Sequence, residues 1–290
     1  MNRFLLDIAA TSMLDASLVA SQALILNRLG VPFAAITAFS GASAYAVALY
    51  LNGSWSFSLS LLILIPLMVV VFSALAKPLP LDRYLLLTLA VLGVLRATAS
   101  ATPALGGQNG ISAVSPVLPP QESYTFALLA LVLFAVALLV HILIERSEFG
   151  LAVSVTRLAR TDVAARAFVP TGKVILACFV VAALIAVCAG AFKGMYAGRV
   201  DPGQFRISYA VILLMATLVG GSSPLRLGLL SLVFFALPDL FSAFIGYDKS
   251  SLAFIRDMAW SVLIIALVSP RLAKRLASGS NAVRAAGAGV

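Results

Sequence analysis

Long apolar runs, separated by short polar segments, are the feature of this sequence that most constrains its fold. Seven clear runs occupy residues 55–76, 84–98, 123–144, 174–192, 207–221, 225–245 and 254–269. Two weaker runs precede them, at residues 8–27 and 32–51. The runs predict an all-α, polytopic integral membrane protein with about nine transmembrane helices, because a helix needs about 20 mostly apolar residues to cross a bilayer.

The composition agrees with this class. Of the 290 residues, 62% are hydrophobic and 11% are charged, and the mean hydropathy is +1.07. Soluble domains carry about 25% charged residues, so the surplus of apolar side chains requires lipid rather than a larger core. The net charge of +9 comes from bases gathered between the runs, without interleaved aromatic residues, which excludes a nucleic-acid-binding class.

Neither the cysteines nor the N-terminus points to secretion. Cys178 and Cys188 lie in one apolar run, about 15 Å apart along a helix, so they cannot form a disulfide and are expected to pack. The first 20 residues contain one base and the acids Asp7 and Asp15, without a cleavage site, so we expect no cleaved signal peptide. Residues 1–290 are expected to form a single transmembrane domain.

Two basic segments predict the orientation. Residues 271–290 carry four bases and no acid, and residues 146–173 are also basic, so both are expected in the cytoplasm. Four apolar runs lie between them, which is the parity that a common side requires. The C-terminus is then cytoplasmic, and the loop at residues 102–121 is on the outer side. The first two runs are open to a second interpretation, as one span plus a re-entrant piece.

The segment at residues 150–169 is too polar to span a membrane. Its apolar residues recur at helical spacing beside Arg157 and Arg160, and Pro170 ends the pattern. Two interpretations are open: a basic amphipathic helix on anionic lipid, or a helix that docks in a cleft of a cytoplasmic partner.

Two segments rich in glycine and proline interrupt the apolar pattern. The loop at residues 102–121 carries no charge and predicts turns and irregular backbone. Residues 219–228 contain Gly220, Gly221 and Pro224. Interrupted membrane segments often line substrate pathways, although a tight turn between two helices explains the second segment equally well.

A few ionisable residues fall within the runs. His141 has only Glu145 on its face, so helix-end packing is favoured over a metal site or proton relay. For Asp15, Arg96 and Asp239, structural pairing is favoured over direct function. Asp15 or Asp239 could still bind the coupling ion of a secondary transporter. The sequence contains no GxSxG, HExxH, CxxC or Walker A motif, so we expect no enzyme and no catalytic residue.

Several short motifs follow one another in a characteristic order. Residues 38–51 contain Gly41-Ala42 and Ala44-Tyr45. The run before the outer loop contains Thr88-Leu89-Ala90 and Arg96, and the loop itself contains the Gly-Gly-x-x-Gly element at residues 106–110. Further on come SEFGLAVSVTRLARTDVAARAF, then GAFKGMYAGRVDPGQF, then LMATLVGGSSPLRLG. In this succession the chain resembles the M-type permease subunit of branched-chain amino acid ABC importers, the LivM family.

The resemblance implies a permease subunit that forms half of the translocation pathway of an ATP-driven importer in the bacterial inner membrane. The solute would be a branched-chain amino acid or a related small molecule such as urea, an amide or an aromatic acid. The implied partners are a second permease subunit, two ATP-binding subunits and a periplasmic solute-binding protein. ATP and Mg would be used by the partner subunits, and this chain would bind no cofactor.

The resemblance also implies roles for particular residues. Residues 155–168 would form the coupling helix, which docks on an ATP-binding subunit through Arg157, Arg160, Thr161, Asp162, Ala164, Ala165 and Arg166. The candidates for the translocation pathway are Gly41, Tyr45, Gly106, Gly107, Asn109, Gly110, Gly220 and Gly221. No metal ligand is expected.

Overall fold

The computed structural model describes residues 2–76, 80–112, 123–159, 171–196, 199–245 and 258. The chain divides into two compact units, Met1–Ala236 and Leu237–Val290. Almost all of the described residues belong to the first unit. The last predicted run, at residues 254–269, lies outside the described residues except for Met258.

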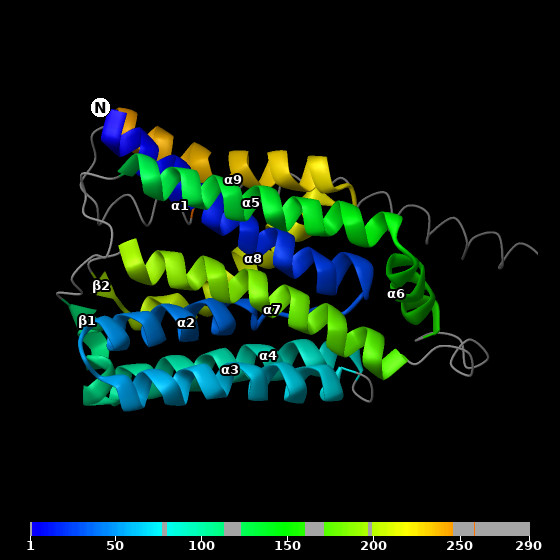
Figure 1. Cartoon of the computed structure of the whole chain (residues 1–290), viewed down its shortest axis with the longest axis horizontal. Coiled ribbons are helices and arrows are strands. Elements are labelled where there is room, and N and C mark those ends of the chain that lie inside the picture. Colours follow the sequence, from blue (N-terminus) through cyan, green and yellow to red (C-terminus); the bar gives the residue numbers. More distant parts are fainter. Residues whose placement is uncertain are drawn as a thin grey trace, which may run out of the picture. The chain divides into compact units, whose positions relative to one another are not determined.

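Helices make up nearly all of the described structure (Figure 1). They are α1 Asn2–Ala23, α2 Ile36–Leu51, α3 Trp55–Leu75, α4 Leu81–Ala101, α5 Ser123–Arg146, α6 Glu148–Ala159, α7 Thr171–Tyr196, α8 Ile207–Gly220 and α9 Pro224–Ile245. A π-helical turn, Leu24–Arg28, continues α1. Short 3-10 turns occur at Pro103–Leu105, Gly107–Asn109 and Pro202–Phe205.

Five of these helical segments are long and apolar enough to cross a membrane. They are Leu5–Arg28, Trp55–Leu75, Leu81–Ala101, Tyr124–Arg146 and Thr171–Tyr196. α2 and α8 are apolar but shorter. The predicted class of multi-pass helical membrane protein is therefore confirmed, whereas the number nine stays a prediction.

The outer helices show why the chain needs lipid. Ile63 in α3, Leu86 in α4 and Leu128 in α5 each expose more than 60% of their surface. Large apolar side chains on a protein surface cost free energy in water but not among acyl chains. α2, by contrast, buries 13 of its 16 residues and lies between α7 and the α3–α4 pair (Figure 1).

α2 and α7 approach closely because small residues line their contact. A Cβ on Gly194 would lie 2.7 Å from the carbonyl oxygen of Ala44, and one on Gly190 would collide with the carbonyl oxygen of Ser40. The Ser43 hydroxyl donates a hydrogen bond of 2.7 Å to the carbonyl oxygen of Val187. Glycines and hydroxyls at such contacts let two backbones pack directly, which is how helices associate within a membrane.

The predicted run at residues 32–51 is wrong at its beginning, because α2 starts only at Ile36. Phe33 and Ala34 precede it in a buried, non-helical conformation. Side chains from other helices satisfy this backbone: Gln22 donates to the Phe33 carbonyl at 2.7 Å, and Thr88 accepts from the Ala34 amide at 3.2 Å. Non-helical backbone within a membrane protein is tolerated where it is buried and paired in this way.

Aromatic rings pack around this non-helical segment. The Phe33 ring lies 5.2 Å from Phe72 and 5.1 Å from Phe179, both edge-on, and 6.3 Å from Tyr84. Offset and edge-on contacts of this kind stabilise a pair by about 0.5–1.5 kcal/mol beyond the area that it buries. The non-helical segment is therefore packed against α3, α4 and α7.

The two ends of the helices in the first unit differ (Figure 1). At one end, β1 Ile111–Ser112 pairs with β2 Arg199–Val200 in an antiparallel register; we call it the strand end. α6 and the π-helical turn lie at the other, which we call the α6 end. The prediction of wholly irregular backbone for residues 102–121 missed β1, because a two-residue strand has no periodicity to detect.

Candidate functional site

The glycine-rich loop of the strand end folds back tightly. Gly106, Gly107 and Gly110 all adopt positive φ angles, of 80°, 59° and 71°. A Cβ on Gly110 would lie 2.6 Å from the Cα of Asp201, so glycine is required there for close approach as well as for conformation. The carbonyl oxygen of Asn109 accepts a hydrogen bond of 2.9 Å from Arg199 Nε.

Tyr45 and Gly41 meet the 3-10 turn Pro202–Phe205. The Phe205 ring stacks on Tyr45 with centroids 5.7 Å apart and planes 16° from parallel. A Cβ on Gly41 would lie 2.5 Å from Phe205 Cε1. Both rings are buried with Ile111. This packing leaves no room for a solute between Gly41 and Phe205.

Six of the eight pathway candidates are therefore gathered at the strand end, around residues 199–206. They are Gly41, Tyr45, Gly106, Gly107, Asn109 and Gly110. Their role in a pathway stays a prediction.

A basic cavity of about 430 Å³ lies at the same end. Its lining comprises Arg96, Ser100, Gln108, Arg199, Asp201, Pro202, Gly203 and Arg206. Asp201 also caps the 3-10 turn, since its Oδ1 accepts from the Gly203 amide at 2.6 Å. The sequence analysis singled out only Arg96 of these residues. The run of charges at residues 199–206, between two apolar runs, was the signal that could have found the others.

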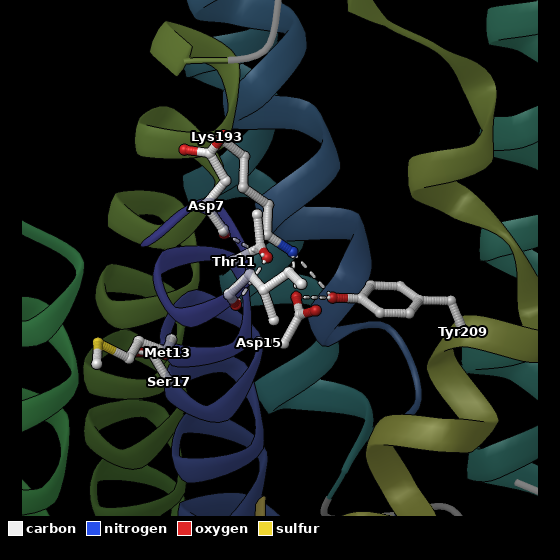
Figure 2. Close-up of polar contacts among 8 residues, drawn as sticks. Asp7, Thr11, Met13, Asp15, Ser17, Lys193 and Tyr209 are labelled. Carbon is white, nitrogen blue, oxygen red and sulfur yellow. Dashed lines mark hydrogen bonds and ion pairs between the residues drawn. The ribbon is translucent and has the colours of Figure 1, made fainter. Parts of the chain in front are cut away.

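Polar side chains from three helices meet inside the bundle (Figure 2). Lys193 of α7 forms an ion pair with Asp15 of α1, and their side chains are 16% and 19% exposed. Tyr209 of α8 donates to Asp15 at 2.5 Å and accepts from Lys193 at 3.0 Å. Asp15 is thus structurally paired. Lys193 lies just beyond the predicted run, which ends at residue 192, whereas α7 continues to Tyr196.

A second polar cluster lies at the α6 end, and we call it the α6-end cluster: Asn27, Arg28, Glu145 and Arg157. Arg28 forms an ion pair with Glu145 of α5 at 3.1 Å and donates to the carbonyl oxygen of Ser222. The cluster therefore joins the end of α1 to α5 and to the turn before α9.

Asn27 and the last two pathway candidates also lie at the α6 end. Asn27 donates to the carbonyl oxygens of Thr217 at 3.3 Å and Gly221 at 2.6 Å. Gly221 has a φ of 72°, and a Cβ on Gly220 would lie 2.5 Å from Leu227 Cδ1. Gly220 and Gly221 form the tight turn between α8 and α9, apart from the other six candidates.

Arg157 is the one predicted coupling residue within the described part of the chain. It lies in α6, where its Nη1 donates to the Asn27 carbonyl at 2.8 Å and its Cγ lies 3.4 Å from a Cβ built on Gly30. The other six fall at positions 160–170, outside the described residues: Arg160, Thr161, Asp162, Ala164, Ala165 and Arg166. Only the first part of the predicted helix 155–168 is thus seen, as the end of α6.

The remaining candidates are His141, Asp239 and the two cysteines. His141 is buried, and its Nε2 lies 3.0 Å from the carbonyl oxygen of Ala20, which agrees with the packing role predicted for it. Asp239 follows Pro238 inside α9. Cys178 and Cys188 are free thiols; Cys178 is buried as predicted, whereas Cys188 is exposed, so the packing role predicted for Cys188 is wrong. No group of three or more histidines, cysteines and acids that could hold a metal ion occurs among the described residues.

Comparison with known protein families identifies the family of this chain. The model of one family, described as the permease component of branched-chain amino acid transport systems, matches residues 4–268. No curated protein and no solved structure shows significant similarity to the chain. The match covers most of the chain, and the membrane-length helices agree with it. The chain therefore belongs to the family of ABC transporter permeases of branched-chain amino acid transport systems, and it is a multi-pass membrane transport protein.

Proposed function

We propose that this chain is the M-type permease subunit of an ATP-driven importer. Its solute is a branched-chain amino acid or a related small molecule such as urea, an amide or an aromatic acid. The observation that carries the proposal is the family match over residues 4–268, together with the five membrane-length helices among the described residues. The chain forms half of the translocation pathway, and a second permease subunit forms the other half.

The remaining partners follow from the same class of transporter. Two ATP-binding subunits bind ATP and Mg, and a periplasmic solute-binding protein delivers the solute, while this chain binds no cofactor. The transporter lies in the bacterial inner membrane. The α6 end and the C-terminus face the cytoplasm, since the basic segments at residues 146–173 and 271–290 favour that side.

The α6-end cluster supports a route for coupling. α6 and the residues that follow it dock on an ATP-binding subunit. Arg157 links α6 to the carbonyl oxygen of Asn27, and Arg28 links the same turn to Glu145 and Ser222. A displacement of α6 therefore acts on α1, α5 and the α8–α9 turn together, as a rigid-body movement of packed helices requires.

Charge reversal and added bulk in the docking segment test this role. Arg160→Glu and Ala165→Trp are introduced into the purified assembly, with Arg160→Lys and Ala165→Ser as matched controls. Both test variants should abolish solute-stimulated ATP hydrolysis and uptake, and the controls should keep most of both. Normal stimulation and uptake in the two test variants would refute the coupling role.

The competing function is a secondary transporter in which Asp15 or Asp239 binds a proton or sodium ion. The ammonium group of Lys193 already lies against the Asp15 carboxylate, so a coupling ion there would have to displace it. Solute uptake by this chain alone in proteoliposomes, driven by an ion gradient without ATP, would establish this alternative instead.

A further inference from the structure

Three arginines converge on the cavity at the strand end. Arg96 comes from α4, Arg199 from β2, and Arg206 directly follows the turn Pro202–Phe205. Among the described residues of the lining, Asp201 is the one acid, so three positive charges against one negative charge leave a net charge of +2. Guanidinium groups stay protonated at any physiological pH, so this charge is permanent.

None of these three arginines forms an ion pair with a described residue. The ion pairs in that part of the chain join Arg28 to Glu145 and Lys193 to Asp15, and neither pair lies at this cavity. Among the described residues, Arg199 donates to the backbone carbonyl of Asn109. The three arginines are exposed to solvent, which screens their mutual repulsion, and a bound carboxylate would reduce that repulsion further.

The other lining groups narrow the class of anion. A guanidinium fork matches the two oxygens of a carboxylate, and Ser100 and Gln108 supply neutral hydrogen-bonding groups. Asp201 in the same lining offers an opposite charge to an ammonium group, which a phosphate does not carry. A lining with both arginines and an aspartate therefore suits a zwitterion. An amino acid is a zwitterion, because it carries both a carboxylate and an ammonium group.

We propose that this cavity is a binding site for the carboxylate of an amino-acid solute. Arg96, Arg199 and Arg206 hold the carboxylate, and Asp201 faces the ammonium group. The inference rests on the proposed function, which makes the chain an importer of small solutes. It also narrows that function, because urea and simple amides lack the carboxylate.

The neighbouring turn places this site before the pathway rather than within it. Pro202–Phe205 contributes Pro202 and Gly203 to the cavity, and it contributes Phe205 to the buried stack with Tyr45. A solute held in the cavity is thus separated from Gly41 by packed aromatic rings. The solute therefore binds at the strand end before the rings of Tyr45 and Phe205 separate.

Binding to the full chain in nanodiscs of zwitterionic lipid tests the site directly. The probe is radiolabelled leucine, with 4-methylpentanoate, leucinamide, urea and inorganic phosphate as competitors. Leucine should bind, 4-methylpentanoate should displace it, and the other three should not.

Arg96→Gln and Arg206→Gln should each weaken leucine binding at least about tenfold, because each removes a charge-assisted hydrogen bond. Arg226→Gln, an exposed arginine of α9 outside the cavity lining, is the matched control and should bind as the unaltered chain does.

Several results would overturn the inference. Failure of leucine to bind would overturn it, and so would equal binding of leucine to the unaltered chain and the two cavity variants. Displacement by phosphate would indicate a general anion site, and loss of leucine binding in nanodiscs of anionic lipid would indicate a headgroup site.

Uptake by the complete ATP-driven assembly separates the two proposals. If both cavity variants take up leucine normally, the site is refuted while the function stands; if the unaltered assembly takes up no candidate solute, the function fails.

Discussion

The contact between α2 and α7 makes a sharp prediction about Gly190→Ala. The added methyl group would collide with the Ser40 carbonyl oxygen and the Ser43 hydroxyl. A backbone carbonyl in a buried helix cannot rotate away, so the two helices must separate. That separation also stretches the hydrogen bond from Ser43 to the Val187 carbonyl.

The expected loss of stability can be estimated from these contacts. Overpacking a tight contact costs about 1–3 kcal/mol. The weakened hydrogen bond between helices costs about 0.6 kcal/mol. Replacing a helical glycine with alanine returns about 0.5–1 kcal/mol. We therefore expect Gly190→Ala to lower the free energy of unfolding by about 1–3 kcal/mol.

Gly172→Ala is the matched control, because Gly172 lies in the same helix and a Cβ there meets nothing within 4 Å. Gly172 is exposed in the first turn of α7, so Gly172→Ala should change the free energy of unfolding by no more than about 0.5 kcal/mol. Both variants are unfolded in mixed detergent micelles and followed by circular dichroism. If Gly190→Ala is as stable as Gly172→Ala, the close contact between α2 and α7 is wrong.

Two further predictions use the same unfolding assay. Lys193→Met leaves the Asp15 carboxylate without its cation and should cost about 2 kcal/mol, less than for a fully buried pair because both side chains are partly exposed. Adding Asp15→Asn should recover at least half of that loss, and an additive double variant would contradict the pairing. Asn27→Ala removes the donor to Thr217 and Gly221 and should cost about 1–2 kcal/mol. Unchanged resistance of the α8–α9 turn to proteolysis would contradict this role for Asn27.

The apolar runs predicted most of the fold, because length and hydropathy alone determine whether a helix can span a membrane. The runs at residues 55–76, 123–144 and 174–192 correspond to α3, α5 and α7, within four residues at each end. The beginning of α2 could not be predicted in this way. The non-helical segment before α2 is as apolar as a helix. Its backbone forms hydrogen bonds with Gln22 and Thr88, which lie elsewhere in the sequence.

The candidate sites were predicted less completely than the fold. The motif order brought out Gly41, Tyr45 and the glycine loop, and the structure gathers these residues at one end. The partners of those motifs were missed, because a stack such as Tyr45 on Phe205 joins residues far apart in the sequence. The pairing of Asp15 with Lys193 was hidden for the same reason, since no local pattern links positions 178 residues apart.

The central claim is that this chain moves a solute only as one part of an ATP-driven assembly. The most direct measurement is uptake of radiolabelled leucine into proteoliposomes, comparing the complete assembly with the chain alone. The complete assembly should take up leucine only with ATP and the binding protein present, and dissipating ion gradients should have no effect. Uptake by the chain alone, driven by a proton or sodium gradient, would contradict the claim.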